Sequence, residues 1–133
     1  MTKDPECCVP SDSVMKAAQL MRSEDVGPIP VVENREERKL TGIVTDRDLA
    51  IKVVAEARDA KTTQVEEVMS EGLVTCREND DVQSVLQLME DNQLRRIPVV
   101  DLSDRLLGIV AQADVATRLG AHATGEVVEQ VSQ

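Results

Sequence analysis

The chain of 133 residues has no Phe, Tyr or Trp, and its only histidine is His122. Without aromatic rings there is no platform on which the bases of single-stranded nucleic acid can stack. The interior must be filled by aliphatic residues, and an apolar content of 41% is enough for a globular core. A single histidine also leaves no nucleophile–base pair of the kind that covalent catalysis needs. We therefore expect no enzyme activity.

Basic residues are also scarce, with 15 Lys and Arg against 25 Asp and Glu and a net charge of -10. A chain this acidic repels phosphate backbones and anionic lipid, so nucleic acid and membrane surfaces are not expected partners. The sequence has neither a run of about 20 apolar residues nor the layout of a signal peptide. These features predict a cytoplasmic protein that must bind any phosphate through local groups.

The cysteines are few and poorly spaced for a metal. Cys7, Cys8 and Cys76 have no C-x-x-C spacing, and together with His122 they offer too few ligands for zinc. We predict no metal site and interpret the cysteines as reduced, buried thiols. A redox role for Cys7 or Cys8 is the alternative.

What the sequence does contain is an internal repeat. Four apolar residues with helical spacing occur twice, as Val14, Ala17, Ala18 and Met21 and as Val82, Val85, Leu86 and Met89. Ser11 and Asn79 are the expected N-caps of these helices. Each helix is followed by a strand that opens at proline (29–32 and 97–100) and by a Gly-Ile-Val strand (42–44 and 108–110). With short first strands at 7–9 and 74–76, each copy reads strand, helix, strand, strand, helix.

The repeat predicts two pseudo-symmetric halves, residues 1–60 and residues 61–133, the second with a short C-terminal tail. Thr63 is expected to cap a short helix at 65–69 that opens the second half. Met1-Thr2 aligns with Met69-Ser70, so the first half has no such lead-in of its own. Either the chain is cut at that point or another segment covers the surface that this leaves open, and the amphipathic residues 126–131 are one candidate.

Each Gly-Ile-Val strand runs directly into a predicted helix. At the first junction Thr45 falls at the N-cap, where free backbone N–H groups attract anions, and Asp48 follows on the first turn. The second junction keeps Asp114 but has Ala111 in place of the threonine. An ionised carboxylate can accept hydrogen bonds from both hydroxyls of a ribose. The alternative is that Thr45 and Asp48 form a capping box, which stabilises a helix by ~1 kcal/mol.

Together these motifs resemble a tandem pair of CBS domains, a Bateman module. The resemblance rests on Val-Met-Ser at 68–70, the two Ile-Pro-Val-Val strands and the two Gly-Ile-Val-x-x-x-Asp junctions, and residues 45–52 and 59–65 are similar to stand-alone bacterial modules of the hypoxic-response-protein type. It implies an α/β (α+β) fold of two βαββα repeats packed about an internal two-fold, usually assembled as a homodimer. The apolar residues after the first junction favour a homodimer independently, because they occupy more than one helix face: Leu49, Ile51, Val53 and Val54.

The function that the resemblance implies is regulatory. Such modules bind AMP, ADP, ATP or S-adenosylmethionine, need no cofactor, and signal to an effector protein, here unknown, by a ligand-dependent change of shape. The alternatives are a structural module whose clefts stay empty and a redox-responsive protein.

The resemblance assigns the ribose to the two aspartates, the phosphate to Thr45, and the adenine edge to the Ile-Pro pairs. Arg47 and Arg96 are added as cations that could neutralise a phosphate. The predicted ligand-binding residues are therefore Thr45, Asp48, Ile29, Pro30, Arg47, Asp114, Ile97, Pro98 and Arg96. Because Ala111 has no hydroxyl, we expect the cleft of Thr45 and Asp48 to bind better than the cleft of Asp114.

Overall fold

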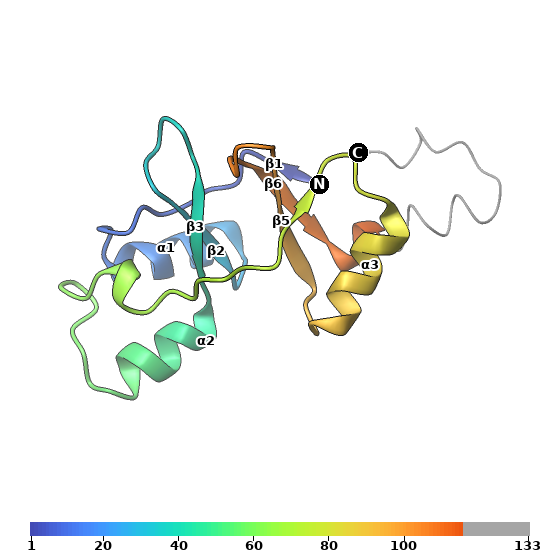
Figure 1. Ribbon diagram of the computed structural model, residues 1–133. Helices are drawn as coiled ribbons and strands as arrows, with labels where there is room; N and C mark the ends of the chain where they lie inside the picture. Colours follow the sequence, from blue (N-terminus) through green and yellow to red (C-terminus); the bar gives the residue numbers. More distant parts are fainter. Residues whose placement is uncertain (116–133) are drawn as a thin grey trace. The chain divides into compact units, whose positions relative to one another are not determined.

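The computed structural model describes residues 1–115 and divides the chain into two compact units (Figure 1). The middle unit is Pro5–Leu73, and the outer unit joins Met1–Asp4 to the chain from Val74 onward. His122 and the candidate covering segment at 126–131 lie outside the described residues. The predicted boundary between the repeats at residues 60 and 61 stays a prediction, because the compact units are defined by contacts in space and not by the sequence repeat.

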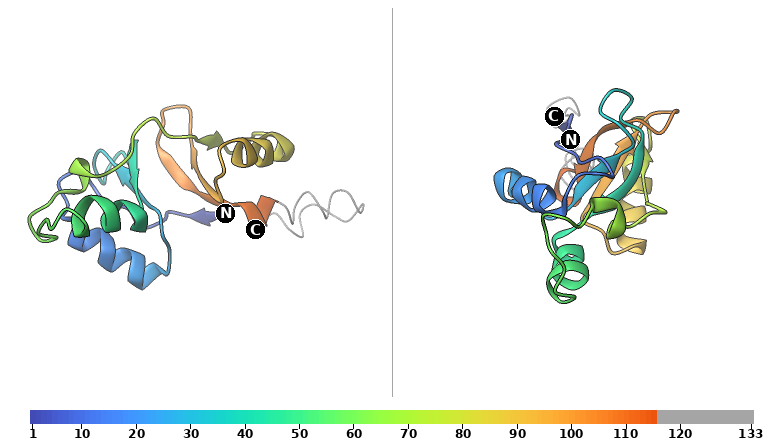
Figure 2. Two further views of the ribbon diagram at one scale, coloured as in Figure 1. Left: turned by 90° about the horizontal axis from the view of Figure 1, so that it is seen from below. Right: turned by 90° about the vertical axis from the view of Figure 1, so that its left-hand side faces the viewer.

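The middle unit is a two-stranded antiparallel sheet with helices. Its elements are α1 (Val14–Glu24), β2 (Ile29–Val32), β3 (Leu40–Val44), α2 (Asp46–Leu49) and a π-helix (Ala50–Val54). The two strands pair with Ile29 opposite Val44, and α1 lies beside α2 (Figure 2). The core of this unit consists mainly of small aliphatic side chains, among them Val14, Ala17, Ile29, Val31, Val44, Val53, Val65 and Val68.

Helix α1 begins two residues later than expected. Its N-cap is Ser13, whose Oγ accepts a hydrogen bond from Lys16 N–H (3.2 Å), so the expectation of Ser11 is wrong. Ala18 is exposed, and Leu20 packs against the core instead. The buried stripe is centred on Ala17, which places Leu20 rather than Ala18 at its edge.

The outer unit is a four-stranded sheet in the order β1-β6-β5-β4 with one helix packed on it. Its elements are β1 (Thr2–Lys3), β4 (Cys76–Arg77), α3 (Val82–Asp91), β5 (Arg96–Val100) and β6 (Leu106–Ala111), and a helix starts at residues 112–115. Only the pair β4–β5 is parallel. Figures 1 and 2 show α3 along the sheet, where Val85 and Met89 meet Ile97 and Val99 in the core.

The N-cap of α3 is Asp81, whose Oδ2 accepts from Ser84 N–H (3.2 Å), so the expectation of Asn79 is also wrong. The two observed caps, Ser13 and Asp81, still occupy equivalent positions of the repeat. The error therefore lies in locating the first helical residue, because more than one side chain before each helix could accept the capping hydrogen bond.

The first strands of the repeats are shorter than expected. Residues 7–9 make a single bridge, between Cys8 and Val31, and the second copy is β4 at Cys76–Arg77. The helix that opens the second repeat is only a 3₁₀ turn, Val65–Glu67, capped by Gln64 and not by Thr63. Thr63 is buried, and its carbonyl accepts the N–H of Val14 (2.9 Å). The Glu67 carboxylate instead accepts the Gln64 N–H (2.7 Å), which together with Arg58 holds the pKa of Glu67 below its usual value.

Two short segments each pair with a strand of the other repeat. Ser70 forms a bridge with Ile43, through N–H···O bonds of 3.0 and 2.9 Å, and so covers β3 of the first repeat. Thr2 pairs with Ile109 and covers β6 of the second repeat. Residues 69–70 are therefore the segment that covers the open surface of the first half, and residues 1–2 cover the corresponding surface of the second half.

The glycine of each Gly-Ile-Val strand allows this close approach. A Cβ on Gly42 would lie 2.7 Å from Met69 Sδ and 3.0 Å from the Ser70 carbonyl oxygen. A Cβ on Gly108 would lie 2.5 Å from the carbonyl oxygen of Thr2. The 2.5 Å contact at Gly108 is with a backbone atom and leaves no room for a Cβ, whereas a Cβ on Gly42 would require the Met69 side chain and Ser70 to shift.

Candidate functional site

The first junction is closed by its own hydrogen bonds. Thr45 is the N-cap of α2, and its Oγ1 accepts the N–H of Asp48 (3.2 Å). Oδ2 of Asp48 accepts the N–H of Thr45 in return (2.9 Å), which completes a capping box. Oδ1 of Asp48 lies 3.2 Å from Nζ of Lys52, and the Asp48 side chain is only 13% exposed. The capping-box alternative is thus confirmed, and both carboxylate oxygens already have partners.

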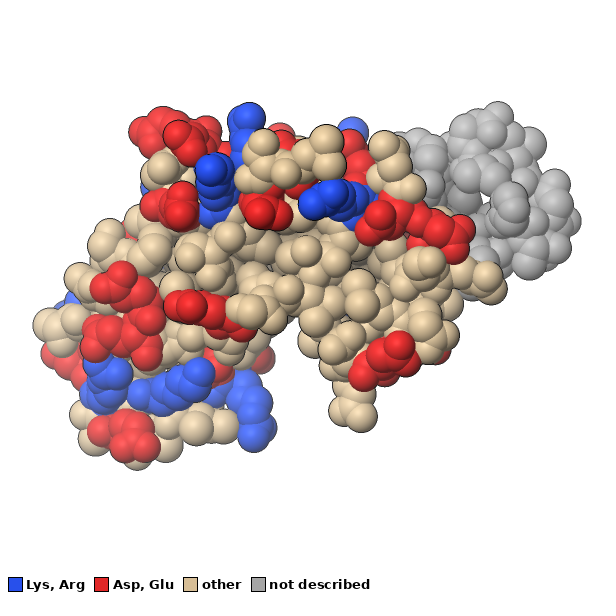
Figure 3. All heavy atoms as spheres, in the orientation of Figure 1, with Lys and Arg blue, Asp and Glu red and all other residues tan. Residues whose placement is uncertain are grey.

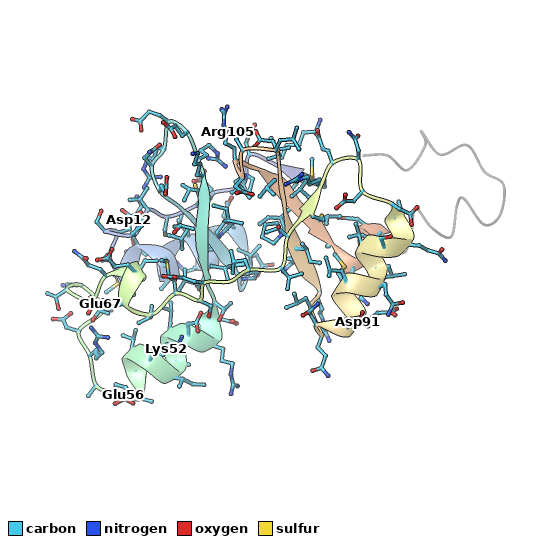
Figure 4. All side chains as sticks on the ribbon, viewed as in Figure 1. Asp12, Lys52, Glu56, Glu67, Asp91 and Arg105 are labelled. Atoms are coloured by element: carbon cyan, nitrogen blue, oxygen red, sulfur yellow. The ribbon has the colours of Figure 1, made fainter. Side chains whose placement is uncertain are left out.

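Lys52 links this carboxylate to a second segment of the middle unit. Its Nζ donates to the carbonyl oxygen of Val68 (2.9 Å), next to the Met69-Ser70 strand that covers β3. Lys52 belongs to the π-helix that continues α2, and Figure 4 shows it projecting from this helix. The sequence contains no signal for a π-helix, since its apolar residues fit an ordinary α-helix equally well.

Charge is balanced locally around α2. Lys52 pairs with Asp48, and Arg58 pairs with Glu67. Figure 3 shows a band of Lys and Arg side chains over the α2 region with Asp and Glu side chains along its borders. Arg47 is exposed and forms no ion pair within residues 1–115. Of the cations at this junction, Arg47 is the one that remains available to a ligand.

The second junction is more open. Oδ2 of Asp114 is 3.4 Å from the N–H of Ala111 and 3.9 Å from the α-amino nitrogen of Met1, and the Asp114 side chain is 49% exposed. Ala111 has no hydroxyl to accept the Asp114 N–H. Because half of the capping box is missing, the carboxylate is held less tightly than that of Asp48.

A cavity of about 250 Å³ lies beside this open carboxylate, within the outer unit. Its wall includes Asp114, the apolar side chains of Val85, Val99 and Val110, and the cation Lys3. The volume is near the lower end of the range for small-molecule sites, ~300–1,000 Å³. Arg77, Glu78 and Asp80 also line the cavity. A wall that combines apolar side chains, carboxylate acceptors and cations suits a ligand with a flat apolar part, hydroxyls and a negative group.

Most of the predicted site residues are elsewhere. Among the residues that the structure describes, Asp114 is the one predicted ligand residue on the cavity wall. The Ile-Pro pairs are buried in the two cores, so only their backbone groups could meet a base: Ile29, Pro30, Ile97 and Pro98. Arg96 is exposed but does not line the cavity. Lys3 was missed because the predicted division assigns it to the first repeat, whereas it reaches the second through the β1–β6 pairing.

The thiols show little sign of reactivity. Burial raises the pKa of Cys8, helped by the Asp12 charge, and also that of Cys76, in each case from 9.0 to about 11. Cys7 is buried too, and its Sγ lies 3.5 Å from Nη1 of Arg38. Within residues 1–115 no group of three or more His, Cys, Asp or Glu side chains could hold a metal ion. The same residues contain no helix long and apolar enough to cross a membrane.

Comparison with known proteins agrees with this geometry. The family model described as CBS domain matches residues 1–55 and 65–121. The chain is 38% identical over 133 residues to the CBS domain-containing protein YhcV of Bacillus subtilis. The match covers 99% of this chain and 91% of YhcV. It is 34% identical over 125 residues to hypoxic response protein 1 of Mycobacterium tuberculosis, covering 94% of this chain and 85% of that protein.

Solved structures show the same fold. A crystal structure of Hypoxic Response Protein I with two coordinated zinc ions matches with a TM-score of 0.77 and 34% identity, over 88% of this chain and 92% of that one. CBSX2 in complex with AMP matches with a TM-score of 0.76 and 25% identity, over 93% and 94% of the two chains. The CBS pair of MJ0100 with 5′-methylthioadenosine and S-adenosyl-L-methionine matches with a TM-score of 0.71 and 30% identity, over 91% and 93%.

Enzymes also occur among the similar proteins, but only over a small part of their length. The inosine-5′-monophosphate dehydrogenase of Methanocaldococcus jannaschii is 35% identical to this chain over 22% of the enzyme. The predicted fold class, a mixed α/β fold of two repeats, is confirmed by the family match and the solved structures.

Proposed function

Because the chain belongs to the CBS domain family and contains two repeats, we propose that it is a regulatory module that binds an adenosine-containing ligand. Binding is passed to an effector protein as a change of shape. The observation that carries this proposal is the cavity beside the half-exposed carboxylate of Asp114. The complexes of CBSX2 and MJ0100 support it, because their ligands share an adenosine group. AMP, ADP, ATP and S-adenosylmethionine are the candidate ligands, and no cofactor is required.

The ribose is the group that Asp114 suits. A carboxylate is acceptor-only, so it can take both hydroxyls of a cis-diol in charge-assisted hydrogen bonds. The valines of the cavity wall offer an apolar face for a base. The residues of the first junction form a second candidate site. There a ribose must replace the contacts that Thr45 and Lys52 make with Asp48.

The proposed role is not enzymatic. The described residues hold no group of three or more His, Cys, Asp or Glu side chains that could bind a catalytic metal. The acidic charge of the chain disfavours nucleic acid and membrane surfaces as partners. A cytoplasmic location, as expected from the sequence, is part of this proposal.

Calorimetry with AMP tests the proposal on the parent, Asp114→Ala and Asp48→Ala. We expect Asp114→Ala to weaken binding by about a hundred-fold or more, since two hydrogen bonds to a charged group are lost, and Asp48→Ala to leave binding at the cavity intact. A structural module with empty clefts would instead give no binding heat. Its melting temperature would also stay the same with AMP, ATP or S-adenosylmethionine.

A homodimer is the second part of the proposal. In the segment after the first junction, Leu49 and Val53 pack into the unit's own core, whereas Ile51 and Val54 are 45% and 75% exposed. Neighbouring apolar side chains on one surface favour a protein contact. Val54→Asp should therefore shift the sedimenting species from dimer to monomer. The control is Leu102→Asp, which places the same charge on another exposed aliphatic residue and should leave the dimer intact. A parent protein that is monomeric at micromolar concentration contradicts this part.

A redox function is the competing proposal, and the contact between Arg38 and Cys7 is the observation in its favour. Reactive cysteines typically lie beside a cation. Burial and raised pKa values act against reactivity at Cys8 and Cys76. Titration of free thiols after exposure to air and after reduction separates the two proposals. We expect three free thiols in both conditions.

A further inference from the structure

The strand register places one cation on the wall of the Asp114 cavity. Lys3 pairs with Gly108, Gly108 with Val99, and Val99 with Cys76, so these four residues form one row across the sheet. Residues paired across neighbouring strands point to the same face. Val99 and Cys76 face α3 and line the cavity. The side chain of Lys3 therefore belongs to the cavity face of the sheet.

Lys3 is also available to a ligand. It is exposed, and it forms no ion pair in the part of the chain that the structure describes. Arg77 also lines the cavity, but it follows Cys76 in β4, so its side chain alternates away from the sheet face that Lys3 shares with Cys76. The charge of Arg77 acts on Asp101, whose pKa is held low first by the N–H of Arg105 and also by Arg77. Lys3 is thus the cation that the register directs toward the cavity.

We propose that Lys3 binds the phosphate of a nucleoside monophosphate whose ribose is held by Asp114. This inference rests on the proposed function and supplies the phosphate contact that Ala111 cannot make. The acidic side chains of Glu78 and Asp80 also line the cavity, and they repel the additional negative charge of a triphosphate. The cavity therefore selects AMP over ATP.

Calorimetry on the full chain with adenosine, AMP and ATP tests the assignment. The parent binds AMP about ten-fold more tightly than adenosine, the gain expected for one hydrogen bond to a charged group, and binds ATP more weakly than AMP. Lys3→Gln removes the preference for AMP and leaves adenosine binding unchanged. Lys3→Arg keeps the preference, and higher ionic strength reduces it in the parent.

Arg77→Gln is the matched control, because it removes the same charge from β4, the opposite edge strand of the same sheet, and should keep the preference for AMP. The assignment is overturned if Arg77→Gln acts like Lys3→Gln, if Lys3→Gln weakens adenosine and AMP equally, if it leaves the preference intact, or if ATP binds as tightly as AMP. A failure of the proposed function looks different. In that case the parent binds neither adenosine nor AMP, or Asp114→Ala binds both normally, and either result overturns this inference as well.

Discussion

Asp48 and Asp114 occupy equivalent positions after β3 and β6, but their carboxylates have different surroundings. Asp48 is 13% exposed and bonded through both oxygens, whereas Asp114 is 49% exposed and 3.4 Å from the nearest backbone N–H. The hydroxyl of Thr45 accounts for much of the difference, since it accepts the Asp48 N–H and so holds the aspartate over its own N-cap. At Ala111 that hydroxyl is missing.

A complete capping box and a bound ribose would compete for the same carboxylate. A ligand at the first junction must break two hydrogen-bonded contacts of Asp48 before it can use them. A ligand at the second junction finds Asp114 beside a cavity. The expectation that the Thr45 cleft binds better stays a prediction, and this geometry supports the opposite order.

The largest expected effect comes from filling the glycines on which the covering segments rest. Gly42→Ala and Gly108→Ala should each lower the free energy of unfolding by about 1–3 kcal/mol, because the added Cβ collides with a crossing strand. Only Gly108→Ala should also remove the AMP preference, since it displaces the strand that carries Lys3. Urea unfolding and calorimetry measure the two effects. A larger loss of AMP binding in Gly42→Ala than in Gly108→Ala would contradict the proposal that AMP binds beside the second junction.

The two aspartates should differ in their contribution to stability. Asp48→Ala loses a capping hydrogen bond and leaves Lys52 without its carboxylate, which should cost about 1–2 kcal/mol. Asp114→Ala should change stability by less than about 0.5 kcal/mol, as is usual for exposed positions. Thermal unfolding of the two variants without ligand makes the comparison. Equal losses would show that Asp114 is as firmly engaged as Asp48.

Exchanging the N-cap residues gives a smaller effect and tests the competition directly. Thr45→Ala should destabilise the protein by ~1 kcal/mol, and Ala111→Thr should stabilise it by up to about the same amount. If capping competes with ligand binding, Ala111→Thr also weakens adenosine binding, because Asp114 is drawn into a complete capping box. Tighter AMP binding by Ala111→Thr would instead support the expectation that the hydroxyl serves the phosphate.

The smallest effect concerns the two buried thiols. Cys8 and Cys76 have the same raised pKa of about 11, but only Cys76 lines the cavity in the described part of the chain. Because the fold favours the neutral thiol, the resulting stabilisation is complete below pH 9 and is lost as the pH rises toward 11. Alkylation followed by mass spectrometry should therefore be slow at both thiols at neutral pH and faster near pH 11. AMP should slow the reaction of Cys76 but not that of Cys8, and equal protection of both would place the ligand elsewhere.

The local features of this protein could be predicted from the sequence. The strands β2 and β5, the Gly-Ile-Val strands and the N-cap role of Thr45 all follow from patterns that span a few residues. The interactions that define them, alternation of side chains and a hydroxyl three residues before its partner N–H, are themselves local. The exact starts of α1 and α3 were missed because neighbouring polar residues could each act as the cap.

The site depended on contacts between residues far apart in the chain. Sequence alignment matched Met1-Thr2 with Met69-Ser70, but nothing in those residues states which strand each will cover. Pairing across such separations is decided by the packing of the whole unit, and it brings Lys3 beside β6 and leaves room next to Asp114. The sequence alone thus determined that there are two aspartates at equivalent junctions. Only the tertiary structure decided that the carboxylate of Asp48 takes part in capping its own helix, whereas the carboxylate of Asp114 faces a cavity.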